Sequence, residues 1–226
     1  MMRIAQVAPL YERVPPRLYG GTERIVSYLT EELIRQGHEV TLFASGDSLT
    51  QARLIAPCER SLRLDPECKN HLIPHLLQLN QLLERAESFD MVHFHTDYVH
   101  FPFAQRLGKP HVTTLHGRLD LADLVPLFEE FAQVPLVSIS DSQRAPLPSS
   151  HWQGTVYHGL PLGLYDVSLR AGTYLAFLGR IARKKESTAQ SKLPNALASS
   201  LESRPRSMPS TSATWKRKFG LYWIIR

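Results

Sequence analysis

Two adjacent glycines, Gly20 and Gly21, lie between an apolar run and a run with helical periodicity. The run RIAQVAP at 3–9 is typical of a buried parallel strand, and TERIVSYLTEELIRQG at 22–37 ends at Gly37, a good C-terminal helix cap. A helix N-terminus presents unpaired N–H groups, and glycine has no Cβ to keep a ligand away. The pair therefore predicts a cradle for a phosphate or a sugar, or else a turn that needs a positive φ. The stretch is neither a Walker loop nor a G-x-G-x-x-G motif.

Three histidines, His93, His95 and His100, lie close together along the chain. The first two share a strand face because side chains alternate along a strand, so a metal site can be considered. Zinc sites assemble three or four ligands, and no cysteine or carboxylate has a suitable spacing here. We therefore predict no metal ion, a core-facing histidine pair, and a position for His95 near a ligand cleft.

A parallel sheet can position these residues. Short apolar or β-branched runs occur at 39–45, 89–97, 109–117, 134–141 and 154–160, and a further short strand is possible at 52–57. Helix-compatible sequence separates most of them, including an apolar stripe in HLIPHLLQLNQLLERAES at 71–88. In the first helix, Ile25, Leu29 and Leu33 form the apolar face. The alternation predicts an α/β fold, a Rossmann-like parallel sheet with flanking helices.

The residues that follow the strands should carry the function. Right-handed crossovers place all these loops at one edge of the sheet, and ligands of open α/β sheets bind there. The residues concerned are Gly20 and Gly21, 45–47, 95–98, His116 and Gly117, 140–144, and His158 and Gly159.

Composition excludes several classes of protein. The hydrophobic fraction is 43%, and no apolar run approaches the roughly 20 residues of a membrane span. The first residues lack a signal-peptide layout, so we expect a cytoplasmic protein. Cys58 and Cys68 lie outside any C-x-x-C pattern, which argues against a disulfide framework and a thiolate metal site.

The net charge of +5 is concentrated in one segment. Residues 183–226 carry ten Lys or Arg against two Asp or Glu, while residues 1–182 carry sixteen against nineteen. A nucleic-acid binder is the alternative that this basic segment raises. No aromatic residues interleave with its charges, and the rest of the chain is mildly acidic, so we predict no nucleic-acid partner. Its Ser, Pro, Lys and Arg content predicts disorder.

An ordered series of motifs resembles one enzyme family. The segments GGTERIVSYLTEELIRQGHEVTLFASGDS, FDMVHFHTDY, VTTLHG, VSISDSQR, VYHGLPL and YLAFLGRIA together resemble the N-terminal half of a family 4 glycosyltransferase of the two-domain GT-B fold, over residues 2–182. The resemblance implies transfer of a sugar, with retention, from a nucleotide-sugar donor such as a UDP-linked hexose. The acceptor would be a small molecule, a lipid or a glycan. Neither a metal ion nor another cofactor is implied.

The resemblance also implies roles for particular residues. Gly20 and Gly21 match the glycine loop near the donor diphosphate, and His116 matches the histidine that orients the donor sugar. A neutral imidazole there could bind a sugar hydroxyl without placing a cation beside an oxocarbenium-like centre. Arg180 and Lys185 match the spacing of the two cations that hold the diphosphate, as a bidentate fork and a point charge.

The acceptor side is predicted from residues that follow other strands. His95 lies near the expected cleft, and Tyr98 can either stack on a ring or pack. Ser140 and Arg144 follow the VSIS strand and can line the acceptor site, although a serine at this place also caps a helix.

The expected domains are a GT-B N-terminal domain at 1–172, the start of the donor-binding domain at 173–182, and a non-homologous tail at 183–226. The family has a glycine after the matched lysine where this chain has Glu186. Codons permitted from Ala182 onward can encode PEKG in a shifted frame, so we expect a frameshift and a second domain cut short. Two rivals stay open: a non-catalytic Rossmann-domain remnant that binds nucleotide or acceptor, and a GT-B nucleotide-sugar epimerase.

Overall fold

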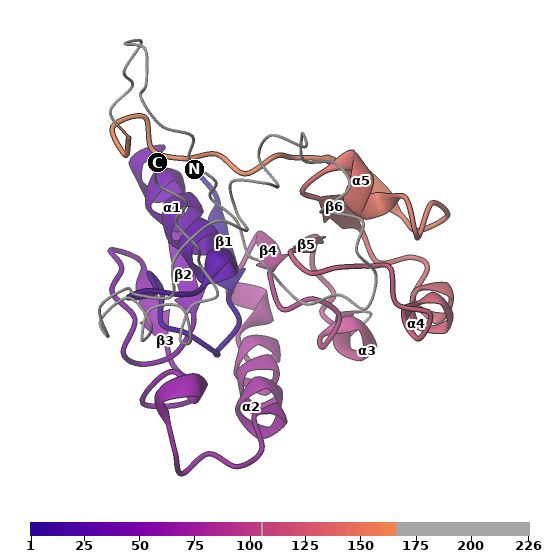
Figure 1. The fold of residues 1–226 in the computed structure, drawn as a ribbon. Coiled ribbons are helices and arrows are strands. Elements are labelled where there is room, and N and C mark those ends of the chain that lie inside the picture. The colour runs from indigo at the N-terminus through magenta and orange to yellow at the C-terminus, as the bar shows by residue number, and fades with distance from the viewer. Residues whose placement is uncertain (105, 166–226) are drawn as a thin grey trace, which may run out of the picture. The chain divides into compact units, whose positions relative to one another are not determined.

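A computed structural model describes residues 1–104 and 106–165. Its centre is a seven-stranded sheet in the order β3-β2-β1-β4-β5-β6-β7, and every pairing is parallel (Figure 1). The strands are β1 (Arg3–Val7), β2 (Glu39–Phe43), β3 (Arg53–Ile55), β4 (Met91–Phe94), β5 (His111–Thr114), β6 (Leu136–Ser138) and β7 (Trp152–Thr155). The predicted α/β class is confirmed, and each run predicted up to residue 141 contains a strand, including the short one within 52–57. The run predicted at 154–160 is a strand only at its first two residues, because β7 ends at Thr155.

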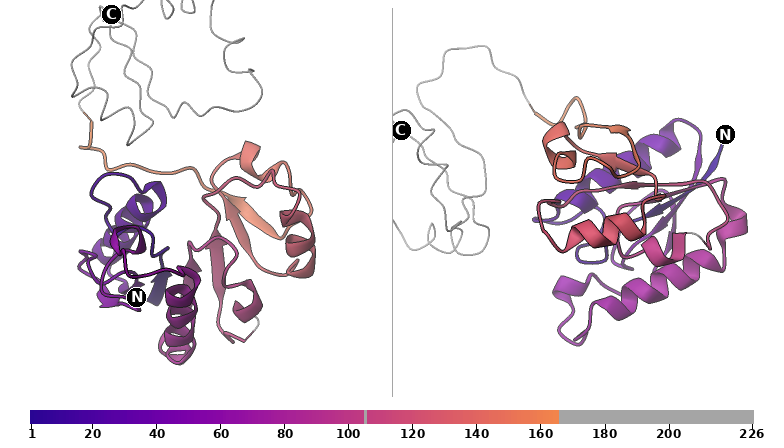
Figure 2. Two further views of the ribbon diagram at one scale, coloured as in Figure 1. Left: turned by 60° about the horizontal axis from the view of Figure 1, so that its bottom comes forward. Right: turned by 90° about the vertical axis from the view of Figure 1, so that its right-hand side faces the viewer.

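Helices connect the strands. They are α1 (Gly21–Arg35), α2 (Leu72–Leu83), α3 (Phe101–Ala104), α4 (Leu124–Glu130) and α5 (Asp141–Arg144), with short 3-10 turns η1 (Leu62–Leu64) and η2 (Ala86–Ser88). The chain leaves β1 toward β2 on one side and later returns to β4 on the other. Right-handed crossovers therefore place α1 on one face of the sheet and α2, α3 and α4 on the opposite face (Figure 2).

The two faces differ in how completely they are covered. On the α2 side, Leu79 and Leu82 pack against Val7 and Val92 in one buried cluster, and a second cluster joins α3 and α4 to β6. On the α1 side, Val26 packs near β2 in a small cluster. On this side of the sheet α1 leaves part of β4, β5 and β6 uncovered, and residues of these strands line an open groove.

The orientation of α1 differs from the prediction. Its buried residues are Glu23, Val26, Ser27 and Thr30, whereas the stripe of Ile25, Leu29 and Leu33 is only partly buried. Ile25 and Leu29 line the open groove instead of the sheet contact. The helix ends as predicted, because Gly37 adopts a φ of 86°.

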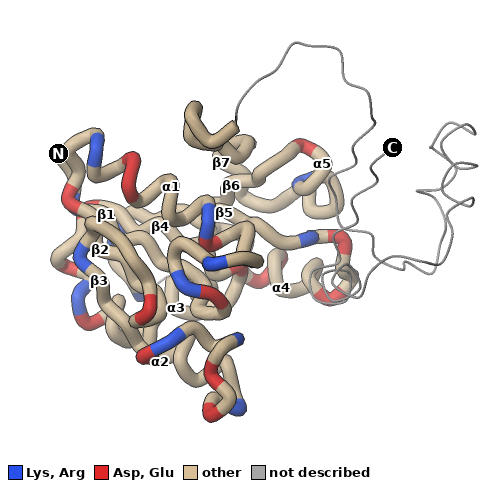
Figure 3. The backbone as a smooth tube through the Cα atoms, turned by 60° about the vertical axis from the view of Figure 1, so that its left-hand side comes forward, with Lys and Arg blue, Asp and Glu red and all other residues tan. Residues whose placement is uncertain are grey.

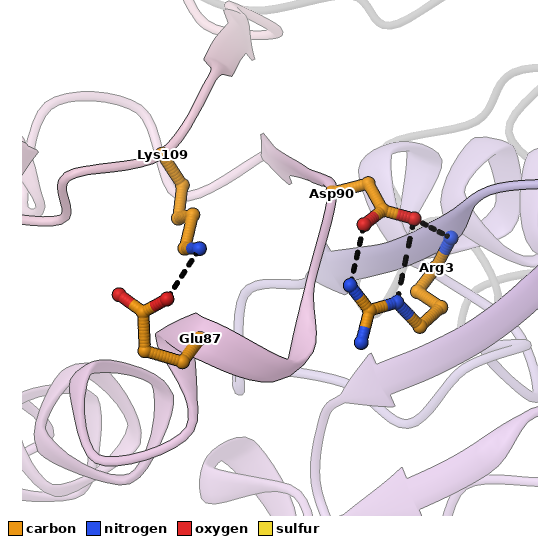
Figure 4. A network of polar contacts seen from close by, with 4 residues as sticks. All are labelled: Arg3, Glu87, Asp90 and Lys109. Atoms are coloured by element: carbon orange, nitrogen blue, oxygen red, sulfur yellow. Dashed lines mark hydrogen bonds and ion pairs between the residues drawn. The ribbon is translucent and has the colours of Figure 1, made fainter.

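Ion pairs join β1, β4 and β5 near the amino ends of these strands. The guanidinium of Arg3 donates to Asp90 with an Nη2–Oδ1 distance of 2.6 Å, and Lys109 pairs with Glu87 (Figure 4). This edge lies opposite the loops expected to bind ligands. Lysines and arginines are interspersed with acidic residues over the described part of the chain (Figure 3).

Several predictions fall outside the described residues. These are the strand in YLAFLGRIA, the diphosphate cations Arg180 and Lys185, the domain boundaries after residue 165, and the character of residues 183–226.

Candidate functional site

The glycine loop lies at the carboxyl edge of the sheet, as predicted. Gly20 has a φ of 134°, and a Cβ on this residue would lie 2.8 Å from the Cβ of Pro16. Gly21 is the first residue of α1, and a Cβ there would meet nothing within 4 Å. Gly20 thus satisfies a backbone requirement, while Gly21 leaves open space beside the helix N-terminus. The predicted donor-binding role of the pair stays a prediction.

A cavity of about 280 Å³ opens beside this loop. Its lining combines Gly20 and Gly21 with aromatic side chains, charged side chains and the loop after β4; it includes Tyr11, Tyr19, Tyr98, Glu12, Arg63 and Asp97. The guanidinium of Arg63 lies 5.0 Å from the ring centroid of Tyr19 and 3.0 Å from Glu12. Aromatic rings with interleaved polar groups can contact both faces of a hydroxylated ligand.

Glu23 lies beneath the cavity in the first turn of α1. Its side chain is buried, at 5% exposure, and burial raises the pKa of its carboxyl group. Backbone N–H groups of Glu12 and of Glu23 itself donate to this carboxylate. It therefore occupies part of the helix terminus, and the open side of the cavity is bounded by Gly21 and Thr22.

Asp97 connects this cavity to the loop after β5. Its carboxylate accepts the backbone N–H groups of His116 and Gly117, and its φ is 50°, in the left-handed region. Residues other than glycine are uncommon in this region, although aspartate is among the types enriched there, and such residues cluster at functional sites. The sequence places Asp97 at the ligand edge but indicates no role for it.

Three polar side chains from neighbouring strands form a continuous row, which we call the histidine row: Gln6, His95 and His116. Gln6 Oε1 lies 2.8 Å from His95 Nε2, and His95 Nδ1 lies 2.9 Å from His116 Nε2. Gln6 and His95 are 0% and 2% exposed. Burial lowers the pKa of His95 well below 6.5 and that of His116 to about 3, so both rings are neutral at physiological pH.

The other histidines surround this row. His93 shares the face of His95, as predicted, with ring centroids 4.1 Å apart, and its Nε2 lies 2.8 Å from Thr114 Oγ1. His158 stacks on His116 at 5.1 Å with an interplanar angle of 21°. His100 is buried on the other face, stacked on Phe94. The described residues contain no group of three or more His, Cys, Asp or Glu arranged to hold a metal ion.

The residues predicted to bind the acceptor lie in different parts of the structure. Tyr98 is 41% exposed and lines the cavity. His95 is buried, and both of its ring nitrogens have protein partners. Ser140 caps α5 by accepting the N–H of Gln143 at 3.1 Å, and Arg144 lies over the ring of Trp152. Ser140 and Arg144 are not part of the lining of the 280 Å³ cavity. The predicted acceptor roles stay predictions.

A larger groove, of about 760 Å³, lies on the open face of the sheet beside α1. Its walls are the partly buried side of α1, the strand residues that face α1, His95 directly after β4, and the extended segment after β7. The strand residues are His93, Val112, Thr114 and Val137. His158 comes from the extended segment, so the groove and the histidine row share a boundary.

The contacts of two members of this site, Gln6 and His158, could not be predicted from the sequence. Gln6 is a polar residue inside the apolar run of β1, and this break in the apolar pattern was the one signal in the sequence. His158 was placed at the ligand edge, but nothing in the sequence indicated that it stacks on His116.

Within residues 1–104 and 106–165, no helix has both the length and the apolar composition that a membrane span needs.

Comparison with curated proteins gives no match. Several solved structures resemble the chain, and AviGT4, MurG and sucrose-phosphate synthase are three of them. AviGT4, a glycosyltransferase involved in avilamycin A biosynthesis, has 24% identity and a TM-score of 0.45, and the match covers 66% of this chain and 39% of that one.

MurG from Acinetobacter baumannii has 12% identity and a TM-score of 0.46, and the match covers 71% of this chain and 47% of that one. Sucrose-phosphate synthase from Thermosynechococcus elongatus has 14% identity, a TM-score of 0.48, and coverage of 68% and 47%. The chain spans less than half the length of each of these proteins.

The sequence profile of Glycosyltransferase Family 4 matches residues 19–182, which is most of the chain. The matched region begins at the glycine loop and includes the described strands from β2 onward. The chain belongs to glycosyltransferase family 4, and its described residues form the Rossmann-like parallel sheet expected for the N-terminal half of a GT-B fold.

Proposed function

We propose that this chain carries the acceptor-side half of a retaining glycosyltransferase, which moves a hexose from a UDP-linked donor to a hydroxyl group of an acceptor. The observation that carries the proposal is the position of His116. It follows β5 at the carboxyl edge of the sheet, it is neutral, and Asp97 links its backbone to the cavity beside the glycine loop. Membership of the family supports the reaction class.

Each part of the site fits one requirement of this transfer. The leaving group is a nucleoside diphosphate, and Gly21 allows its close approach to the N-terminus of α1. A neutral His116 can orient a sugar hydroxyl without repelling positive charge that develops at the anomeric carbon. We assign Arg180 and Lys185 to the diphosphate, in place of a metal ion, from their family spacing alone.

The acceptor is proposed to enter the 280 Å³ cavity, where Tyr98 offers an exposed ring. We keep residues 1–172 as the acceptor-side domain and 173–182 as the start of the donor-binding domain. The expected location is the cytoplasm, which the two free cysteines, Cys58 and Cys68, support.

Binding of UDP and UDP-glucose to the full chain, measured by calorimetry, tests the proposal. His116→Ala should weaken UDP-glucose binding by about tenfold, the value of one good polar contact, and leave UDP binding unchanged. His38→Ala is the matched control, because His38 lies at the opposite edge of the sheet, where the N–H of Met2 donates to it. Equal binding of UDP-glucose by the His116→Ala variant and the wild type would contradict the assignment.

Release of UDP separates the proposed enzyme from its rival, the non-catalytic remnant. We expect weak turnover by this chain, because its resemblance to the family extends only over the first residues of the donor-binding domain, at 173–182. Turnover of about 1 per second or more, abolished by His116→Ala, would show that this chain suffices for full activity. Binding without any UDP release would favour the remnant.

A further inference from the structure

The histidine row crosses three adjacent strands of the sheet. Gln6 lies in β1, His95 directly follows β4, and His116 lies two residues after β5. The order β1-β4-β5 makes these strands neighbours, and the register pairs Gln6 with His93, two residues before His95. Gln6 and His95 therefore face the same side of the sheet, toward α1, and the row ends at the residue that we assign to the donor sugar.

The hydrogen bonds of the row couple the proton position on one histidine ring to the proton position on the next. Each neutral imidazole carries one N–H and one bare nitrogen. Where Gln6 Oε1 accepts, His95 Nε2 must hold the proton, and His95 Nδ1 is then bare. A bare His95 Nδ1 requires a proton on His116 Nε2, which leaves His116 Nδ1 bare. If the Gln6 amide were rotated by 180°, its N–H group would face His95, and the donor and the acceptor would change places in every hydrogen bond of the row.

We propose that Gln6 is a positioning residue that sets the tautomer of His116 through His95. With Gln6 Oε1 facing His95, the free nitrogen of His116 is a hydrogen-bond acceptor. This nitrogen, Nδ1, is buried and has no hydrogen-bond partner among the described residues, so the row ends at an unused acceptor.

Because His116 Nδ1 is an acceptor, it determines which kind of ligand group can bind there. A bare nitrogen accepts from a hydroxyl and repels the lone pairs of a phosphate or carboxylate oxygen. That the hydroxyl belongs to a donor sugar rests on the proposed function, whereas the tautomer itself does not. The stacked ring of His158 lies against this histidine, so we expect His158 to move when a ligand hydroxyl reaches Nδ1.

The tautomer can be read without any substrate. Long-range ¹H–¹⁵N correlation spectra of the full chain, labelled with ¹⁵N-histidine, distinguish a protonated ring nitrogen from a bare one. The expected result is a protonated Nε2 and a bare Nδ1 on both His95 and His116. A protonated Nδ1 on His116 in the wild-type chain would overturn the proposal.

Two variants and one control test the role of Gln6. Gln6→Met keeps the length of the side chain and removes the acceptor, so the tautomer ratio at His116 should shift by about fivefold, as expected for the loss of one neutral hydrogen bond. Gln6→Leu, which also removes the acceptor and keeps an apolar side chain of similar size, should give the same shift. Thr114→Val removes the partner of His93 and should leave the His116 tautomer unchanged.

The outcomes separate this inference from the proposed function. An unchanged His116 tautomer in Gln6→Met would overturn the role of Gln6, whatever the chain binds. If Gln6→Met does not fold, the wild-type and Gln6→Leu spectra still decide, because the wild type must show a bare Nδ1 on His116 and Gln6→Leu must show a shifted tautomer ratio. A confirmed tautomer without any binding of UDP-glucose would retain the role of Gln6 and refute the donor-sugar assignment.

Discussion

A Cβ placed on Gly20 would lie 2.8 Å from the Cβ of Pro16, closer than two such atoms can approach. The neighbouring Gly21 has open space at the same position. The first glycine is therefore required by the fold of the loop, and the second can be substituted without strain.

Gly20→Ala should destabilise the chain by about 1–3 kcal/mol, because alanine must adopt a positive φ and displace Pro16. Gly21→Ala should leave the free energy of unfolding within about 0.5 kcal/mol of the wild type. Urea unfolding measures both. Equal stability of the two variants would show that the loop relaxes around Gly20.

Gly21→Ala should nevertheless weaken UDP binding by about tenfold or more, since its methyl group occupies the approach to the N-terminus of α1. Calorimetry with UDP on the folded variant measures this effect. Unaltered affinity in Gly21→Ala would place the diphosphate elsewhere.

Asp97→Ala should cost about 1–3 kcal/mol of stability, because the N–H groups of His116 and Gly117 lose their acceptor. Asp97→Asn keeps one acceptor oxygen and tolerates the φ of 50°, so it should cost less. Thermal unfolding of the two variants shows which of them loses more stability. A stability of Asp97→Ala equal to that of Asp97→Asn would contradict the assigned hydrogen bonds.

Stability should fall as the pH falls below about 6.5. Burial lowers the pKa of His95 and His100, so the unfolded chain takes up protons in this range while the folded chain does not. Each buried histidine contributes up to about 1.4 kcal/mol per pH unit, until the pH reaches its folded-state pKa.

Urea unfolding at pH values between about 7 and 5 measures this slope. A free energy of unfolding that stays constant over this range would show that the buried histidines are protonated in the folded chain.

Ser140→Ala should cost about 1 kcal/mol, since Ser140 caps α5. The exposed Ser142 lies in the same helix, so Ser142→Ala is the control and should cost less. Should Ser140→Ala instead keep full stability but alter acceptor affinity, the acceptor role of Ser140 would be favoured over the cap.

Local sequence determined much of the architecture. The strands could be predicted because buried parallel strands are short apolar runs, and α1 because its periodicity and Gly37 mark its course and its end. The order of strands and loops placed His116 and the glycine pair at the ligand edge, and residues 19–182 carry enough family pattern to identify the family.

Tertiary structure alone decided which side chains meet. Sequence periodicity shows that Ile25 and Leu29 share a face of α1, but only packing against the sheet shows that this face borders an open groove. Gln6 and His95 are 89 residues apart, and their hydrogen bond depends on the pairing of β1 with β4. Such contacts arise from strand register and crossover handedness, which act between segments, so no local pattern of residues encodes them.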